Sequence, residues 1–227
     1  HTLSGSGKGS VITVSEGAQL SLHDCGKGGC VTGGKATEGG GIYVAKGAAL
    51  SLESGAICGN EANRGGGIFA AEGASVTVTG GELRGNSAKS GGGLFLRGDS
   101  DISGMEIFGN RAEYNGAGLY AEMAEGGNVS LSHCSIEGNS GLGHGGGIYL
   151  KNCQLAAADC RIANNVVTEA HASGGGVYID EYAGFTMTGS TLISGNSAAN
   201  QGGGVCVSGS TPTAGFAMDS GEISGNK

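Results

Sequence analysis

One position in this sequence is repeatedly aromatic, and it is the first feature that could bind a ligand. It follows a glycine-rich triplet and one aliphatic residue, and its copies lie 26, 26, 25, 29, 29 and 28 residues apart. We call these residues the aromatic column: Tyr43, Phe69, Phe95, Tyr120, Tyr149 and Tyr178, with Cys206 in the last place. An exposed row of rings could stack on sugar rings or on a partner protein.

The C-terminal half of the aromatic column is the candidate ligand-binding site, with Phe95, Tyr120, Tyr149 and Tyr178 as its residues. Longer segments at 121–128, 166–173 and 208–215 lie beside these residues and would form the sides of a shallow groove. The alternative is that the rings only stack on one another, which stabilises a sheet by roughly 0.2–1 kcal/mol per pair.

A second candidate is the tripeptide Arg97-Gly98-Asp99, which spells an integrin-binding sequence at an expected turn. Arg97 and Asp99 are therefore included among the candidate ligand-binding residues. The alternative is a solvated turn, because such a match arises easily in a glycine-rich chain.

Acidic residues and histidines offer a third kind of chemistry, metal binding. Glu122, Glu125, Asp180 and Glu181 could gather around calcium, but they lack the spacing of a known calcium loop, which favours a solvated acidic edge. The histidines at 133, 144 and 171 have no regular metal-ligand spacing. We predict no metal site and no cofactor.

The elements that carry these residues follow from the repeat itself. A fixed period of 25–29 residues is typical of a solenoid. Each repeat holds three segments of alternating apolar and polar residues, bounded by Gly, Asn and Ser, which predict three short strands. The whole chain, residues 1–227, is therefore predicted to be one all-β domain, a parallel β-helix of about eight coils.

An asparagine follows glycine at the end of each third strand, and stacking would place these asparagines in line. We predict an internal amide ladder that satisfies backbone groups at the turns, and no catalytic or metal-binding role. Its members are Asn60, Asn86, Asn110, Asn139, Asn165, Asn196 and Asn226.

The seven cysteines are an odd number, so at least one thiol has no partner within the chain. Cys134 and Cys160 each lie two residues before a repeat isoleucine, so they should stack about 4.8 Å apart in adjacent coils. They form either a disulfide or two stacked buried thiols. Cys25 and Cys30 could close a short local loop.

Composition excludes some classes of function. A net charge of −8, from 12 basic and 20 acidic residues, makes nucleic acid an unsuitable partner. No apolar run approaches the length of a membrane span, and no signal peptide opens the chain. We expect the sequence to be part of a longer protein.

The phrases Gly65-Gly66-Gly67-Ile68 and Ile57-Cys58-Gly59-Asn60 resemble the repeats of the chlamydial polymorphic outer-membrane proteins. That family alternates a Gly-Gly-Ala-aliphatic motif with a Phe-x-x-Asn motif; this chain has Gly in place of Ala and an aliphatic residue in place of Phe. The pattern covers residues 31–226. The resemblance implies a right-handed β-helix on a bacterial cell surface or outside the cell, often an adhesin or autotransporter passenger.

The sequence thus favours an adhesin that attaches to a host-cell surface protein or glycan. One alternative is a polysaccharide lyase or hydrolase, since such enzymes occur among β-helices. Their sites need carboxylates, with or without a basic partner, converging on one outward face. The outward positions considered, the aromatic column and a second row of Ser, Thr and Ala, supply none, so we predict no enzyme activity. The other alternative is a stalk.

Overall fold

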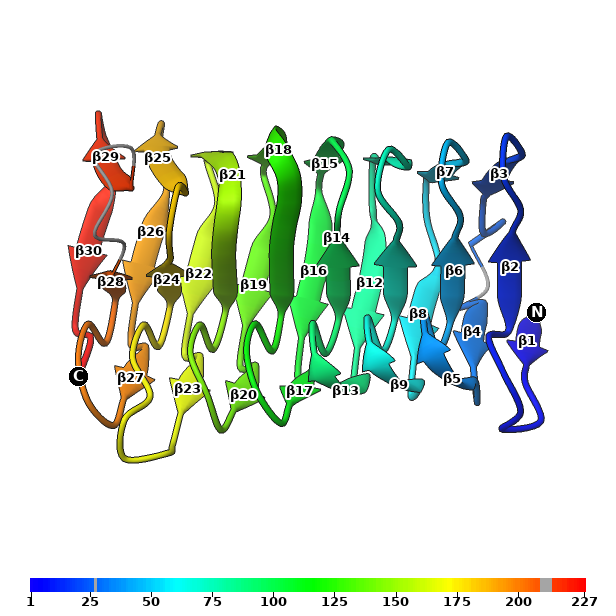
Figure 1. Ribbon diagram of the computed structural model, residues 1–227, viewed down its shortest axis with the longest axis horizontal. Helices are drawn as coiled ribbons and strands as arrows, with labels where there is room; N and C mark the ends of the chain where they lie inside the picture. Colours follow the sequence, from blue (N-terminus) through cyan, green and yellow to red (C-terminus); the bar gives the residue numbers. More distant parts are fainter. Residues whose placement is uncertain (27, 209–213) are drawn as a thin grey trace.

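The computed structural model describes residues 1–26, 28–208 and 214–227. They form a row of parallel coils stacked along one axis (Figure 1). Each coil contributes strands at up to four positions of the cross-section, which we number from the glycine triplet onward. All pairings between these strands are parallel and join equivalent segments of adjacent coils. The predicted fold class, a parallel β-helix of about eight coils, is confirmed.

The strands of the first two positions together form a 14-stranded sheet. At the first position lie β2 (Ile12–Val14), β6 (Ile42–Val44), β10 (Ile68–Ala70), β14 (Leu94–Leu96), β24 (Val177–Ile179) and β28 (Val205–Val207). At the second lie β3 (Gln19–Leu22), β7 (Ala49–Leu52), β11 (Ser75–Val78), β15 (Ser100–Ser103), β25 (Gly184–Thr188) and β29 (Gly215–Met218). Two long strands, β18 (Leu119–Ser132) and β21 (Ile148–Ala158), run through both positions.

The third position forms a nine-stranded sheet. It contains β1 (Thr2–Ser4), β4 (Cys30–Thr32), β8 (Ala56–Cys58), β12 (Gly81–Arg84), β16 (Met105–Phe108), β19 (Ser135–Glu137), β22 (Arg161–Ala163), β26 (Leu192–Ser194) and β30 (Glu222–Ser224).

A fourth position, not predicted from the sequence, forms a seven-stranded sheet of short strands. These are β5 (Lys35–Glu38), β9 (Glu61–Arg64), β13 (Ser87–Ser90), β17 (Arg111–Ala112), β20 (Ser140–Gly141), β23 (Val166–Val167) and β27 (Ser197–Ala198). In β9 only Ala62 is buried, so the segment has no apolar alternation by which to recognise a strand.

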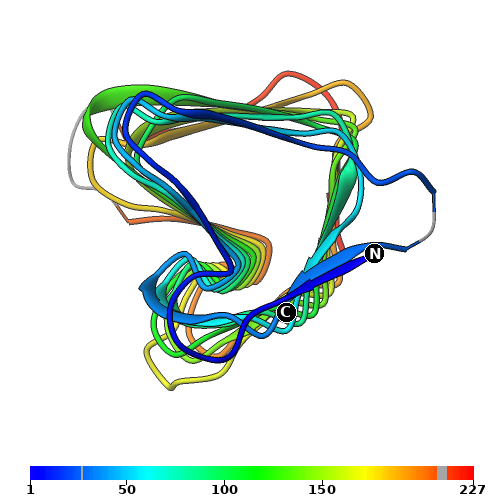
Figure 2. The ribbon, with the colours of Figure 1, turned by 90° about the vertical axis from the view of Figure 1, so that its right-hand side faces the viewer.

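The core fills the inside of the coils, because the inward residue at each position stacks on its equivalent in the next coil. Ile42, Ile68 and Leu94 are in register and fully buried, and Leu119, Ile148 and Val177 continue their line. Viewed end-on, the coils overlay closely around one interior (Figure 2). No helix in the described part of the chain is long and apolar enough to cross a membrane.

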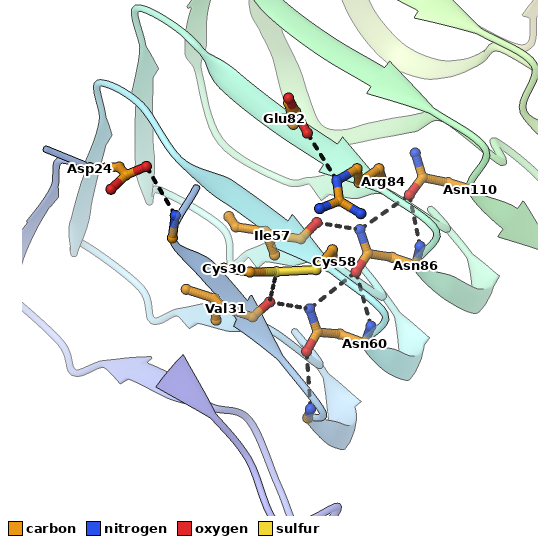
Figure 3. Close-up of a disulfide and its surroundings, with 12 residues drawn as sticks. Asp24, Cys30, Val31, Ile57, Cys58, Asn60, Glu82, Arg84, Asn86 and Asn110 are labelled. Atoms are coloured by element: carbon orange, nitrogen blue, oxygen red, sulfur yellow. Dashed lines mark hydrogen bonds and ion pairs between the residues drawn. A yellow bond between two sulfur atoms is a disulfide. The ribbon is translucent and has the colours of Figure 1, made fainter. Parts of the chain in front are cut away.

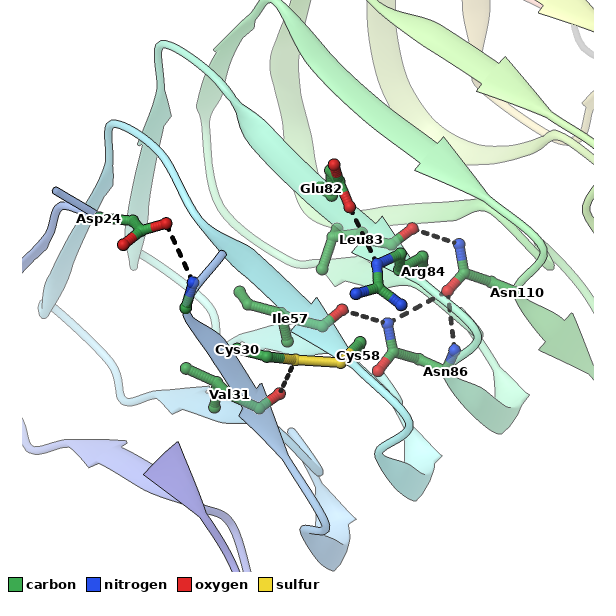
Figure 4. A network of polar contacts seen from close by, with 11 residues as sticks. Asp24, Cys30, Val31, Ile57, Cys58, Glu82, Leu83, Arg84, Asn86 and Asn110 are labelled. Carbon is green, nitrogen blue, oxygen red and sulfur yellow. Dashed lines mark hydrogen bonds and ion pairs between the residues drawn. A yellow bond between two sulfur atoms is a disulfide. The ribbon is translucent and has the colours of Figure 1, made fainter. Parts of the chain in front are cut away.

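The predicted asparagine ladder is confirmed. Asn110 is fully buried, and its Oδ1 accepts hydrogen bonds from the backbone N (3.0 Å) and the Nδ2 (3.1 Å) of Asn86. Its Nδ2 donates to the backbone oxygen of Leu83 (2.9 Å) and to Oδ1 of Asn139 (3.0 Å). The same pattern repeats from Asn60 to Asn226, and Figures 3 and 4 show its first members.

The glycine triplets are needed for close approach between coils. A Cβ at Gly92 would lie 2.3 Å from the backbone oxygen of Arg111 and 2.6 Å from that of Ala117, so no side chain fits there. The preceding Gly91 has a φ of 65°, which L residues seldom adopt.

The predicted local pairing of Cys25 with Cys30 is wrong. Cys30 instead forms a disulfide with Cys58 in the next coil, with 6.4 Å between their Cα atoms, and Cys25 is an exposed free thiol (Figure 3). Because β4 and β8 are adjacent in the sheet, stacking brings two cysteines that are 28 positions apart in the sequence within reach of a disulfide. Cys134 and Cys160 are buried free thiols joined by a side-chain hydrogen bond, which is the second of the two predicted alternatives.

Candidate functional site

The aromatic column points outward from the first strand position, but it is buried rather than exposed. Phe95 is 2 % exposed, Tyr120 9 %, Tyr149 5 % and Tyr178 8 %. The prediction of an exposed aromatic ladder is therefore wrong for these four residues. Ring faces that are covered in this way cannot stack on a sugar or a partner.

Two contacts bury the rings. Each ring lies between the rings of adjacent coils, with centroid distances of 4.4 Å from Phe95 to Tyr120 and 4.7 Å from Tyr120 to Tyr149. The triplet glycine of the same coil also lies against the side chain: a Cβ at Gly145 would be 2.8 Å from the Cβ of Tyr149. The end-on view shows the coil indented at this turn (Figure 2). The column is thus an internal stack that stabilises the sheet.

A second outward row lies directly beside the aromatic column. Its members follow the aromatic residues by two positions, and we call them the charged column: Arg97, Glu122, Lys151 and Asp180. All four are half-buried, and their charges alternate from coil to coil. Glu122 is in register with Lys151, and the backbone N of Asp180 donates to Leu150, so the row continues through adjacent coils.

Sequence reasoning named three of these residues for other reasons and missed Lys151. Arg97 was assigned to a tripeptide, and Glu122 and Asp180 to a possible calcium site. Strand alternation could have identified the row. In a strand, every second residue points to the same side, so the residue two positions after an outward aromatic residue also points outward. Carboxylates and basic groups are therefore present on this face, contrary to the prediction from the aromatic column alone.

The hydroxyl of Tyr149 connects the two columns, since it donates a hydrogen bond to the carboxylate of Asp180. Burial and the bond to Asp180 raise the pKa of Tyr149 above its usual range. Burial, followed by the charges of Glu122 and Asp180, likewise raises the pKa of Tyr120. Both phenols are therefore protonated at neutral pH, and that of Tyr149 donates to Asp180.

His144, which precedes the glycine triplet of the Tyr149 coil, stacks on the ring of Tyr178 in the next coil, with 4.3 Å between centroids. Its Nδ1 accepts a hydrogen bond from the backbone N of Ser173 (3.1 Å), so the proton of the neutral ring is assigned to Nε2. Burial, and then the nearby His171, lower the pKa of His144 below its ordinary value. His144 is therefore mainly neutral at pH 7.

The Arg97-Gly98-Asp99 turn is packed against its neighbours, so the expectation of an exposed turn is wrong for Arg97 and Gly98. The Nε of Arg97 is buried without a hydrogen-bond partner, and a Cβ at Gly98 would lie 2.0 Å from the backbone oxygen of Ala74. Asp99 is exposed, but its Oδ1 accepts a hydrogen bond from the backbone N of Asn128 (2.7 Å). The tripeptide is not presented as a free loop.

The four acidic residues weighed as possible calcium ligands are not grouped in the described part of the structure. Glu122 and Asp180 share the charged column with Lys151 between them, Glu181 is an exposed residue outside that row, and the side chain of Glu125 lies outside the described residues. His133 lies elsewhere, 3.9 Å from Asp159. Among the described residues, no three His, Cys, Asp or Glu side chains are grouped to hold a metal ion.

The three segments predicted to wall a groove differ in structure. Residues 121–128 are not a loop, because they belong to the continuous strand β18. Residues 166–173 hold β23 and the turn that carries His171. Of the third segment, residues 209–213, including Pro212, lie outside the described residues.

The outer face of the third position carries two charged pairs. Arg84 bonds Glu82 (2.9 Å), as Figure 3 shows, and Arg161 bonds Glu137 (2.7 Å). These four side chains are between about a third and a half exposed. They offer a matched control for the charged column.

Comparison with known protein families gives one match. Residues 11–213 fit the family model described as "Right handed beta helix region". No match was found among curated proteins or among solved structures.

Proposed function

Because the chain belongs to the right-handed β-helix family, we propose that it is a bacterial adhesin, secreted or held at the cell surface. In this proposal the charged column attaches it to a host-cell surface protein or glycan. The observation that supports this proposal is a single row of alternating charge on the first face, formed by Arg97, Glu122, Lys151 and Asp180. The phenol of Tyr149 lies beside the row and donates to Asp180.

The arrangement supports binding because it is polar, rigid and only partly exposed. A regular sheet holds each side chain on a strand or at its end, and a preorganised set of groups loses little entropy on binding. Positive and negative groups that alternate along a line provide complementarity to a ligand that carries both kinds of partner, and so provide specificity. Half-buried charges are less screened by salt than fully exposed ones.

Two further observations support the proposed location. The Cys30–Cys58 disulfide is of a kind that forms and persists in oxidising compartments such as the outside of the cell. The repeat phrases also resemble those of the chlamydial polymorphic outer-membrane proteins, in which β-helical passengers are displayed at the surface. The resemblance supports an adhesin, and the site itself must come from this chain's own residues.

The test is binding of the purified protein to a glycan array and to cultured epithelial cells. In the face variant, each member of the charged column is replaced by serine (Arg97→Ser, Glu122→Ser, Lys151→Ser and Asp180→Ser). We expect the face variant to lose binding while it melts as a folded β-protein.

A matched control variant removes two positive and two negative charges from the third face instead (Glu82→Ser, Arg84→Ser, Glu137→Ser and Arg161→Ser). Neither variant changes the net charge of the protein. A difference in binding between the two variants would therefore depend on which face was altered. Failure of the wild-type protein to bind any glycan or cell would refute the adhesin and leave a stalk as the better account.

The charged column also favours a second candidate, a carbohydrate-active enzyme. Asp180 and Lys151 place a carboxylate and a basic group on one outward face, next to the phenol of Tyr149. The raised pKa of Tyr149 disfavours that phenol as a general base, so binding is the first proposal. New reducing ends or unsaturated sugars released from a panel of polysaccharides, and lost in Asp180→Asn, would instead support the enzyme.

A further inference from the structure

The aromatic column ends at Tyr43, and this end differs from the rest of the stack. Tyr43 lies on Phe69, with 5.7 Å between centroids and 5° between the ring planes. On its other side the register partner in the first coil is Thr13, not an aromatic residue. Tyr43 is only half-buried, whereas Phe69, which has an aromatic residue on both sides, is 2 % exposed. One face of the first ring therefore lacks an aromatic neighbour.

A hollow of about 550 Å³ lies at this end of the column. Its lining includes Ser10, Thr13, Lys35, Thr37, Glu38 and Tyr43. The hollow is shallow and largely open to solvent, so it can cover one face of a small ligand and leaves the other face in water.

The walls of the hollow are held by hydrogen bonds and need not be formed by the ligand. Gly9 and Lys35 exchange backbone bonds of 2.7 and 3.0 Å, which fix the first loop against β5. The hydroxyl of Ser10 donates to the backbone oxygen of Glu38 (3.2 Å). A preformed wall lowers the ordering cost of binding.

The charges at the hollow are already compensated. Lys35 bonds Glu61 (2.8 Å), and Glu38 lies 3.4 Å from Arg64. A charged ligand would have to compete with these pairs. The hydroxyls of Thr13 and Thr37 can donate and accept hydrogen bonds, which suits a ligand that carries hydroxyl groups and no charge.

We propose that this hollow is a subsite for one neutral hexopyranose ring, whose C–H face would lie on Tyr43 while its hydroxyls contact the polar lining. The proposal deepens the proposed function and rests on it for the class of ligand, but it uses a separate site. An aromatic ring provides a flat apolar surface with a polar tip, and a few placed polar groups fix the orientation of a ligand. At the opposite end of the column, Tyr178 is 8 % exposed and has Cys206 in register and packed against the stack, so that end differs from the half-buried ring of Tyr43.

The test uses saturation-transfer NMR on the full chain with methyl glycosides of glucose, galactose, mannose and N-acetylglucosamine. We expect transfer from the protein to the protons of one ring face for at least one of them. Tyr43→Ala should reduce the affinity for that glycoside at least tenfold. If none of the four shows transfer, the proposal is overturned.

The more specific variant is Thr13→Phe, which would place a ring where the column stops. It should extend the stack, keep or raise the melting temperature, and block the hollow, so that binding is lost without loss of stability. Transfer that persists in Thr13→Phe would overturn the proposal even if Tyr43→Ala fails to fold.

Two controls separate the site from general effects. Thr13→Val keeps the volume of the side chain, so affinity should fall only about two- to twelvefold, in keeping with the loss of one hydroxyl contact, and transfer should remain detectable. Ser130→Phe adds a ring at an exposed position of the second face and should leave transfer unchanged. The face variant should still bind the monosaccharide. The experiment can therefore refute the proposed subsite without refuting the proposed role of the charged column, and the reverse also holds.

Discussion

Replacing Asn110 with alanine should destabilise the middle of the solenoid more than any substitution on its surface. Asn110 is fully buried, and its side chain makes four hydrogen bonds. Two of these serve backbone groups, the N of Asn86 and the oxygen of Leu83. Alanine can replace none of them, and the site is too enclosed for the lost bonds to be made to bulk water.

The magnitude follows from those four bonds. At about 0.5–1.5 kcal/mol net for each, their loss amounts to about 2–6 kcal/mol. The end of the ladder provides a matched comparison, because Asn226 is half-buried and makes three such bonds. Water can reach that end, so Asn226→Ala should cost distinctly less than Asn110→Ala.

The assay is guanidinium unfolding of the two variants, followed by circular dichroism, together with hydrogen exchange of the amides near Asn86. Repeat arrays can unfold in parts, so the exchange data locate the loss and the midpoint measures it. A loss below about 1 kcal/mol for Asn110→Ala, or one equal to that of Asn226→Ala, would refute the argument that the ladder satisfies buried groups.

Three further outcomes are expected. The folded state lowers the pKa of His144 below its ordinary value of 6.5, so the contribution of this residue to the free energy of unfolding is present above pH 6.5 and is lost as the pH falls below that value. Wild type should therefore lose stability between pH 7 and 5.5 relative to His144→Phe. If the stabilities of the two proteins, measured by urea unfolding, change in parallel with pH, the argument is contradicted. Replacing both Cys30 and Cys58 with serine should lower the free energy of unfolding by roughly 3–4 kcal/mol, because the disulfide closes a loop of 28 residues and so restricts the unfolded chain. The loss is measured from the denaturant midpoint, and an unchanged midpoint would contradict the prediction. Gly92→Ala should prevent folding, since its Cβ would meet backbone oxygens. At Gly109 a Cβ has open space, so Gly109→Ala should lower the free energy of unfolding by only about 1–2 kcal/mol, because of the positive φ. Equal melting temperatures for the two variants would refute the close-approach argument.

Much of the fold could be predicted from the sequence because solenoid positions repeat. The inward line through Ile68 and the asparagine ladder through Asn110 each perform the same task in every coil, so seven copies of one pattern outweigh any local ambiguity. Strands such as β9 could not be predicted, because a segment with one buried residue has no periodic signal.

Outcomes that depend on packing outside the repeat were harder to predict. Alternation correctly placed Tyr149 on the outer side of its strand, but not the fold of the glycine turn that covers it. The Cys30–Cys58 pairing depends on the offset between adjacent coils, which the irregular first coil obscures in the sequence. Lys151 was missed because it matches no motif, and only its place between Glu122 and Asp180 gives it significance.

The claim on which the functional account depends is that the charged column is the binding face. The most direct measurement compares the amounts of face variant and control variant that bind to epithelial cells, each relative to wild type at physiological salt. The account predicts at least a tenfold loss for the face variant and a change of less than twofold for the control. Equal binding by the two variants would contradict it.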